Sequence, residues 1–299
     1  IVRANLRTAF GTSAVRFRGG GDDRSKLRLD LDLEIDVGEL ALRQAVNMSD
    51  DCCPPGSLPA LTEDTARKVN GVVEKVGDLD CYYVAPPAAT TKAIIVIYDV
   101  HGFSGGRIKG VCDALGASGF HVAMLDVYRG TNITEQGGFG SESGTAFLKP
   151  ATANCAAMHE PLFSYLAGKG ATEYGSVGFC WGAYGVVKLS SLGKLKAGVS
   201  CHPSLKVGQM FLGESEEDQV KTVKCPQMFL PAANDPDHYK DGTLKALVEA
   251  TGHACVTHEF KEMKHGWVPR GDASDPKGPV ARDVAAALEM AAGFFRSHL

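Results

Sequence analysis

A cysteine stands between two glycines in Gly178-Phe179-Cys180-Trp181-Gly182, where an apolar run gives way to a helical pattern. This spacing predicts a sharp strand-to-helix turn, with Cys180 as a nucleophile in the position that serine usually takes. Glycine on both sides lets such a turn close without a Cβ that would crowd the strand or the helix. The N-terminus of the following helix favours a thiolate and a developing oxyanion. Taken alone, the pattern also fits an inert buried cysteine on a glycine-rich turn.

A thiol nucleophile needs a base, and the base needs a group that orients it. Downstream of Cys180 the chain offers Asp235 and then His265, which is the order of nucleophile, acid and histidine in hydrolases built on this turn. Each residue follows a predicted strand, and open α/β sheets form their sites at the carboxyl ends of strands. Asp237 is a rival acid, because Asp235-Pro236-Asp237 leaves the register open. We therefore predict a triad of Cys180, His265 and one of these two acids.

A further polar group follows the first predicted central strand, in Tyr98-Asp99-Val100-His101-Gly102. In α/β hydrolases this position supplies the second backbone N–H of the oxyanion hole. A carboxylate here could pair with a basic group or hold the resting thiol. It could equally be a turn or helix-capping residue.

The hydrophobic pattern predicts the elements that position these residues. Two apolar segments flanking Gly77-Asp78 predict a β-hairpin. We expect strands at 93–98, 121–126, 174–179, 196–201, 227–231 and 254–260, and helices at 105–118, 156–169, 183–192, 239–251 and 280–297. Residues 131–149 are glycine- and serine-rich and are predicted to be irregular. This alternation predicts a mostly parallel, doubly wound α/β sheet with the hairpin as an antiparallel edge.

The composition narrows the classes of partner. The 299 residues are 44% hydrophobic and 22% charged, with a net charge of −4, so we expect neither nucleic acid nor a membrane as a partner. Nine cysteines without a repeating spacing predict free thiols in a reducing compartment. The spacing of His253, His258 and His265 matches no standard zinc pattern, and we expect no metal and no cofactor.

Residues 1–47 differ in composition from the remainder, and we place the catalytic domain at 48–299. Residues 1–21 contain four arginines and no acid, which is typical of an organelle transit peptide or of a disordered leader. Residues 27–42 alternate leucines with acids and predict a strand, although a helix at 37–46 fits equally well. We expect the protein in the cytoplasm, or in an organelle if the leader directs import.

Together these residues resemble the dienelactone hydrolase (carboxymethylenebutenolidase) family of α/β hydrolases over residues 48–299. The resemblance rests on Cys180 in G-F-C-W-G, Asp99 in D-V-H-G, Asp126-Val127-Tyr128, Asp235, and His265 in H-G-W. It implies the three-layer α/β hydrolase fold, with Cys180, Asp235 and His265 as the triad. It also implies that Asp99 helps to activate the cysteine. The backbone N–H groups of Val100 and Trp181 would form the oxyanion hole.

The chain departs from the bacterial members of that family and looks more like the eukaryotic branch. Bacterial members carry Glu where Asp99 stands and an apolar aromatic residue where His101 stands. They hold a substrate carboxylate with two arginines; Arg129 matches one of them, and Arg270 lies one residue later than the other. We therefore take Arg129, Arg270, His101 and Tyr128 as candidate substrate-binding residues.

The resulting prediction is a hydrolase that cleaves activated lactones or esters through a Cys-His-Asp triad and a thioester acyl-enzyme. A general carboxylesterase or thioesterase is the alternative within the same class. A non-catalytic binding or redox-sensing protein that uses Cys180 as a reactive thiol is the alternative from another class. We expect a small ester or lactone as the partner molecule and a monomer or small homo-oligomer as the assembly.

Overall fold

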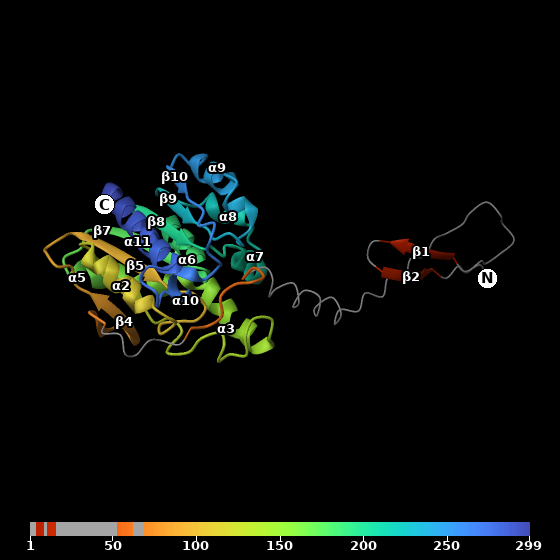
Figure 1. The fold of residues 1–299 in the computed structure, drawn as a ribbon, viewed down its shortest axis with the longest axis horizontal. Helices are drawn as coiled ribbons and strands as arrows, with labels where there is room; N and C mark the ends of the chain where they lie inside the picture. Colours follow the sequence, from red (N-terminus) through yellow and green to blue (C-terminus); the bar gives the residue numbers. More distant parts are fainter. Residues whose placement is uncertain (1–3, 9–10, 16–52, 62–68) are drawn as a thin grey trace. The chain divides into compact units, whose positions relative to one another are not determined.

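The structure, a computed structural model, describes residues 4–8, 11–15, 53–61 and 69–299. The chain divides into two compact units, Ile1–Gln44 and Ala45–Leu299. In the first unit, strands β1 (Ala4–Thr8) and β2 (Gly11–Val15) pair antiparallel (Figure 1). The strand predicted at 27–42, the alternative helix at 37–46 and the domain start at residue 48 lie outside the described residues.

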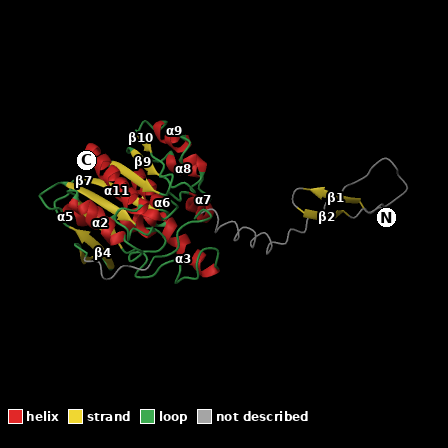
Figure 2. Ribbon diagram, viewed as in Figure 1, coloured by secondary structure: helices red, strands yellow, loops and turns green. Residues whose placement is uncertain are grey.

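The second unit contains an eight-stranded sheet in the order β10-β9-β8-β7-β5-β6-β4-β3 (Figure 2). Strands β5 to β10 run parallel to one another, whereas β4 is antiparallel to both β6 and β3. The predicted mostly parallel sheet with an antiparallel hairpin at its edge is thereby confirmed. The strands are β3 (Val72–Val76), β4 (Leu79–Val84), β5 (Lys92–Ile97), β6 (His121–Leu125), β7 (Glu173–Phe179), β8 (Ala197–Cys201), β9 (Gln227–Leu230) and β10 (Cys255–Thr257).

Helices cover both faces of the central strands, which explains why these strands are almost continuously apolar. The surroundings of two glycines in β7 show that one layer of helices lies on each face of the sheet. A Cβ on Gly175 would meet the ring of Phe295 in α11 (Pro279–His298), whereas one on Gly178 would meet the backbone of Gly182 in α6 (Trp181–Ser191). Residues three apart on a strand face opposite sides, so α11 and α6 lie on opposite faces of the sheet.

Two segments of the chain have a helical structure that differs from the prediction. The segment 131–149, predicted to be irregular, contains the start of α3 (Glu142–Ala153), where the Ser141 hydroxyl accepts the Gly144 N–H at 2.9 Å as an N-cap. The helix predicted at 156–169 is divided into α4 (Cys155–His159) and α5 (Pro161–Gly168). Pro161 has no N–H to continue the first helix but suits the first turn of the second.

The C-terminal half also differs from prediction in detail. Strand β10 is only three residues long, and the predicted strand 254–260 continues only as an isolated bridge between Ala232 and Phe260. The helix predicted at 239–251 begins later, because Gly242 takes a left-handed conformation immediately before it. The remaining helices are α2 (Ile108–Ala117), α7 (Lys206–Leu212), α8 (Glu216–Val220), the 3₁₀ turn η1 (Asp237–Tyr239), α9 (Thr243–Glu249) and α10 (Trp267–Arg270), of which only α2 and α9 were predicted. None of the described helices is both long and apolar enough to cross a membrane.

Candidate active site

The loops that leave parallel strands β5, β7 and β9 bring Asp99, Cys180 and Asp235 to the same edge of the sheet. Cys180 occupies the turn between β7 and α6 with φ 55° and ψ −115°. A non-glycine residue in this region is strained, and such strain is typical of a nucleophile held on a sharp turn. The turn is held by bonds at both backbone groups of Cys180, whose N–H donates to Cys201 O at 3.2 Å and whose carbonyl accepts from the N–H of Ser204 at 3.2 Å.

The two glycines that flank Cys180 are required by close backbone packing. A Cβ on Gly178 would lie 2.1 Å from the carbonyl oxygen of Gly182, and one on Gly182 would lie 2.1 Å from that of Ile97. Neither backbone atom can yield without separating α6 from the sheet. The sequence-based expectation that small residues allow this turn is therefore confirmed in its geometry.

His265 pairs with Asp235, and Asp237 does not join them. His265 Nδ1 lies 2.6 Å from Asp235 Oδ1, and both side chains are fully buried. The second carboxylate oxygen of Asp235 accepts the N–H of Ala232 at 2.7 Å, which fixes its orientation. The side chain of Asp237, in contrast, is 94% exposed and pairs with Lys240.

The environment of His265 stabilises its protonated form. Burial alone would lower the imidazole pKa, but this effect is outweighed by the negative charges of Asp235 and Cys180 and by hydrogen bonds to both. The result is a pKa raised from 6.5 to about 10. At neutral pH these surroundings therefore favour a protonated imidazole beside the sulfur of Cys180.

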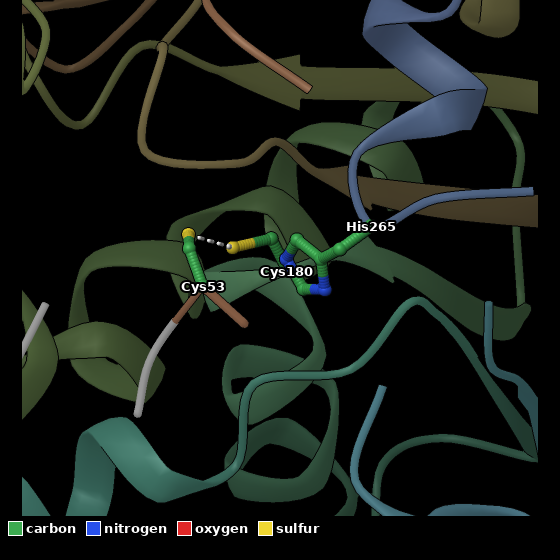
Figure 3. Close-up of side chains that lie close together, drawn as sticks. All are labelled: Cys53, Cys180 and His265. Atoms are coloured by element: carbon green, nitrogen blue, oxygen red, sulfur yellow. Dashed lines mark hydrogen bonds between the residues drawn. The ribbon is translucent and has the colours of Figure 1, made fainter. Parts of the chain in front are cut away.

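A second thiol lies against the nucleophile. Cys53 Sγ is 3.9 Å from Cys180 Sγ, and Figure 3 shows both sulfur atoms on the same side of the His265 ring. Cys53 and Cys180 lie 127 residues apart, and nothing in the sequence predicted that they would meet. The Cys180 Sγ is also 3.4 Å from the hydroxyl of Ser204.

The side chains of Cys53, Cys180 and His265 also form a group that could hold a metal. The ligand atoms of Cys53, Cys180 and His265 all lie within 4.8 Å of one another. Two thiolates and one imidazole suit a soft ion such as Zn²⁺, with water as the fourth ligand. Such an ion would occupy the sulfur of the candidate nucleophile, so it would compete with nucleophilic chemistry at Cys180.

Asp99 is paired with Arg270 in a second buried cluster. Arg270 Nε lies 2.9 Å from Asp99 Oδ2, and the two side chains are 1% and 2% exposed. Asp99 Oδ1 also accepts the N–H of His101 at 2.8 Å. Arg270 Nη1 donates to His101 Nε2 at 3.0 Å and to the carbonyl oxygen of Leu58. Burial is the largest influence on His101 and lowers its pKa, which suits a neutral ring that accepts from Arg270.

The other candidate substrate-binding residues are placed differently. Arg129 is not brought into either cluster, because its guanidinium pairs with Asp78 at 2.7 Å in the turn of the β3–β4 hairpin and is 62% exposed. The Tyr128 ring packs on Trp181 with centroids 5.2 Å apart. Its buried hydroxyl has no hydrogen-bond partner in the described part of the chain.

A pocket of about 380 Å³ adjoins the second cluster. Its lining includes His101 and Phe103 from the loop after β5 and Leu61 from the 53–61 segment. The opposite wall comes from the segment between Gly130 and Glu135. A larger hollow of about 880 Å³ lies between Ser191 and His253 and is lined by none of the candidate site residues. The smaller pocket is therefore the better candidate for a substrate entrance.

One buried histidine beside the site was missed by sequence reasoning. His202 is fully buried with φ 36°, and its ring meets that of His265 edge-on with centroids 4.9 Å apart. Burial, followed by the charge of His265, lowers its pKa well below 6.5, so the ring is neutral. A signal existed, since His202 directly follows strand β8, at the same edge of the sheet as Cys180 and Asp235.

The fold is that of an α/β hydrolase, with Cys180 on the sharp turn between β7 and α6. Residues 79–299 match the dienelactone hydrolase family, and the chain belongs to that family. It is accordingly a hydrolase that acts on ester bonds, including those of lactones.

Three relatives illustrate the extent of the similarity. The hydrolase pyvD of Aspergillus violaceofuscus is 24% identical over 78% of this chain and 90% of its own. The hydrolase tropI of Talaromyces stipitatus is 23% identical over 77% and 91%, respectively. The human carboxymethylenebutenolidase homolog is 26% identical over 66% of this chain and 78% of its own.

Solved structures share the fold at lower identity. A candidate dienelactone hydrolase from Klebsiella pneumoniae superposes with a TM-score of 0.59 at 16% identity, covering 77% of this chain and 99% of that one. A thermophilic esterase from Thermogutta terrifontis gives a TM-score of 0.54 at 14% identity, covering 76% and 94%. These similarities show the α/β hydrolase fold.

Proposed function

We propose that the protein hydrolyses activated lactones and esters through a Cys180–His265–Asp235 triad and a thioester acyl-enzyme. The observation that carries the proposal is the buried 2.6 Å pairing of His265 with Asp235 beside a cysteine held on a strained turn. The family supports ester or lactone hydrolysis, and the geometry supports this set of residues for performing it.

Acylation begins from the thiolate–imidazolium pair. Cys180 Sγ attacks the carbonyl carbon of the substrate, and the negative charge moves to the carbonyl oxygen. The backbone N–H groups of Val100 and Trp181 are the proposed donors to that oxyanion. Trp181 is the first residue of α6, where helical N–H groups have no acceptor within the helix. Donors of this kind contribute about 2.7–4 kcal/mol each to the stability of the transition state.

Breakdown of the adduct determines the substrate class. The C–O bond breaks, a thioester forms on Cys180, and His265 gives its proton to the departing oxygen. A thiolate leaves more readily than an alkoxide, so an adduct with a plain ester tends to revert to the starting ester. The enolate of an enol-lactone leaves far more easily. This chemistry favours activated lactones over plain esters.

Deacylation uses the same histidine in its neutral form. Once the thiolate charge is consumed in the thioester, His265 loses part of the stabilisation that raised its pKa. The neutral imidazole can then remove a proton from water as the water attacks the thioester. Cys180 departs as a thiolate, the acid product is released, and the proton on His265 restores the starting pair.

The decisive measurement is turnover by Cys180→Ala and Cys180→Ser variants on a matched panel of an enol-lactone, its saturated ester and its thioester. For Cys180→Ala we expect kcat/KM to fall by about 10⁴-fold or more with each active substrate, because removal of the nucleophile removes the acyl-enzyme route, whereas Cys180→Ser keeps an oxygen nucleophile. Cys255→Ser, which alters another cysteine of the same sheet, is the matched control and should retain activity. Substantial turnover by Cys180→Ala would refute the proposal.

The same panel separates the substrate classes. Preference for the enol-lactone supports the leaving-group argument, whereas preference for the thioester would make the protein a thioesterase. A mass increase on Cys180 equal to the acyl group, trapped by acid quenching during turnover, would identify the thioester itself.

A further inference from the structure

The contact between Cys53 and Cys180 has no role in the mechanism above. The two Sγ atoms lie 3.9 Å apart, and the two side chains point toward one another (Figure 3). Cys180 is fully buried, whereas Cys53 is half-buried. Two thiols in contact have a chemistry of their own, because a sulfur that becomes oxidised can react with the neighbouring thiol to form a disulfide.

The segment that carries Cys53 is fixed to the loops of the active site. The N–H of Leu58 donates to the carbonyl oxygen of His265 at 2.9 Å. Asn234, which directly precedes Asp235, donates from its side chain to Pro55 O at 3.1 Å. Arg270 donates to Leu58 O. Cys53 is therefore held beside the nucleophile by the same loops that position the base and its acid.

The other described cysteines have a different environment. Six further thiols, at Cys81, Cys112, Cys155, Cys201, Cys225 and Cys255, are buried. Burial raises the pKa of each of them, so all six stay protonated at neutral pH. A protonated, buried thiol reacts poorly with oxidants. Oxidation is thus directed to the two thiols that lie in contact beside His265.

We propose that Cys53 is a resolving thiol that forms a reversible disulfide with Cys180 when a hydroperoxide oxidises the nucleophile. The Cys180 thiolate attacks one peroxide oxygen and the O–O bond breaks, which gives a sulfenic acid and hydroxide. The Cys53 thiolate then attacks the Cys180 sulfur and expels a second hydroxide. With hydrogen peroxide, two thiols lose two electrons and two protons, and one peroxide becomes two waters.

The geometry suits this step. A disulfide has an S–S distance of about 2.05 Å, so the two sulfurs must approach by about 1.9 Å. Cys180 is fixed by the turn, and the movement falls to Cys53. Hydrogen peroxide is smaller than any ester, so a route open to an ester substrate is open to it as well.

The disulfide would protect the nucleophile as well as inactivate it. A sulfenic acid that meets no thiol proceeds to sulfinic acid, which ordinary thiol reductants do not reverse. Closure onto Cys53 stops oxidation at a stage that dithiothreitol reverses. Cys53 thus makes inactivation of the enzyme by peroxide a reversible switch.

The test compares the wild type with Cys53→Ser and Cys53→Ala in the full chain, with Cys52→Ser as the matched control. Each protein is treated with hydrogen peroxide in the presence of EDTA, so that a metal bound by the same ligands cannot protect them. Peptide mass spectrometry then measures the Cys53–Cys180 cross-link and the sulfinic form of Cys180. This readout does not depend on hydrolysis, so its failure is distinguishable from failure of the proposed function.

In the wild type and in Cys52→Ser, we expect most oxidised Cys180 to be cross-linked to Cys53 and fully released by dithiothreitol. In both Cys53 variants we expect the cross-link to be absent and sulfinic Cys180 to accumulate at least tenfold more. Thiol reductant should then restore little of the free Cys180. Equal sulfinic oxidation in the wild type and the Cys53 variants would overturn the proposal, as would a cross-link of Cys180 to Cys52 in place of Cys53.

Discussion

Two buried ion pairs lie at the functional edge of the sheet, and they differ in one chemical respect. Asp235 pairs with His265 at 2.6 Å, and Asp99 pairs with Arg270 at 2.9 Å. All four side chains are at most 2% exposed. The anion is the same in both pairs, but an imidazolium can release its proton, whereas a guanidinium is charged under all working conditions.

Because of this difference, we expect one pair to act in the reaction and the other to stabilise the fold. The Asp235–His265 pair can exchange a proton with a reacting group, so its removal should impair the reaction more than the fold. The Asp99–Arg270 pair cannot exchange a proton in this way. It ties the loop after β5 to α10 and, through Leu58, to the segment that carries Cys53. Loss of its carboxylate leaves a buried charge that cannot be neutralised, and the expected penalty is in folding.

The largest effect is expected from Asp235→Asn. The amide keeps the shape of the carboxylate but cannot stabilise the imidazolium, so we expect kcat/KM to fall by about 10⁴-fold. The free energy of unfolding should change far less, because His265 can lose its proton when its counter-charge is removed. Steady-state kinetics and urea unfolding measure the two quantities.

Asp237→Asn is the matched control, since its carboxylate lies two residues away and is exposed. It should leave kcat/KM within about twofold of the wild type, as expected for a surface substitution. A pH profile adds a second readout. In the wild type kcat/KM should decline as the pH rises through about 10, where His265 loses the proton it gives to the leaving group. In Asp235→Asn this decline should move to lower pH, and an unmoved decline would argue against the pairing.

The second effect is on stability. We expect Asp99→Asn to reduce the free energy of unfolding by about 3–5 kcal/mol, because Arg270 remains buried without a counter-charge. Chemical denaturation at neutral pH measures the loss. In the double variant Asp99→Asn/Arg270→Met no charge remains, so most of the lost stability should return. If the double variant is no more stable than Asp99→Asn, the cost comes from packing or hydrogen bonds and the comparison of the two pairs fails.

The sequence was informative where local patterns decide the structure. The glycines around Cys180 predict the turn because only glycine fits the approach of α6 to β5 and β7, and apolar runs predict strands buried on two faces. The same reasoning placed Asp235 and His265 after strands, and the structure brings them together. The sequence pattern did not distinguish Asp235 from Asp237, because both precede helical residues. Only the fold shows that one position is buried and the other is exposed.

Tertiary contacts decided the parts that the sequence did not predict. Cys53 is held beside Cys180 by hydrogen bonds from Leu58 to His265 and from Asn234 to Pro55, and no spacing in the sequence encodes these contacts. The start of α3 was missed because glycine and serine are poor helix formers, although Ser141 is a recognisable N-cap. Arg129 followed a matching motif, but the motif does not say which way the side chain turns.

The smallest effect is expected from Arg129→Met, which removes the exposed partner of Asp78. Both side chains of this ion pair are more than 60% exposed. We expect the free energy of unfolding to change by about 0–1 kcal/mol, the range of surface ion pairs, against the several kcal/mol of the buried arginine pair. Urea unfolding of Arg129→Met beside the wild type measures this difference.

Kinetics with two substrates decide whether Arg129 also serves the site. A lactone that bears a carboxylate and its methyl ester differ only in the charge that an arginine would bind. If Arg129 stays with Asp78, Arg129→Met leaves the ratio of the two KM values unchanged. If it turns to the substrate, KM rises about tenfold or more for the charged lactone alone. Asp78→Asn separates these outcomes further, because it releases Arg129 without removing it and would then lower KM for the charged lactone.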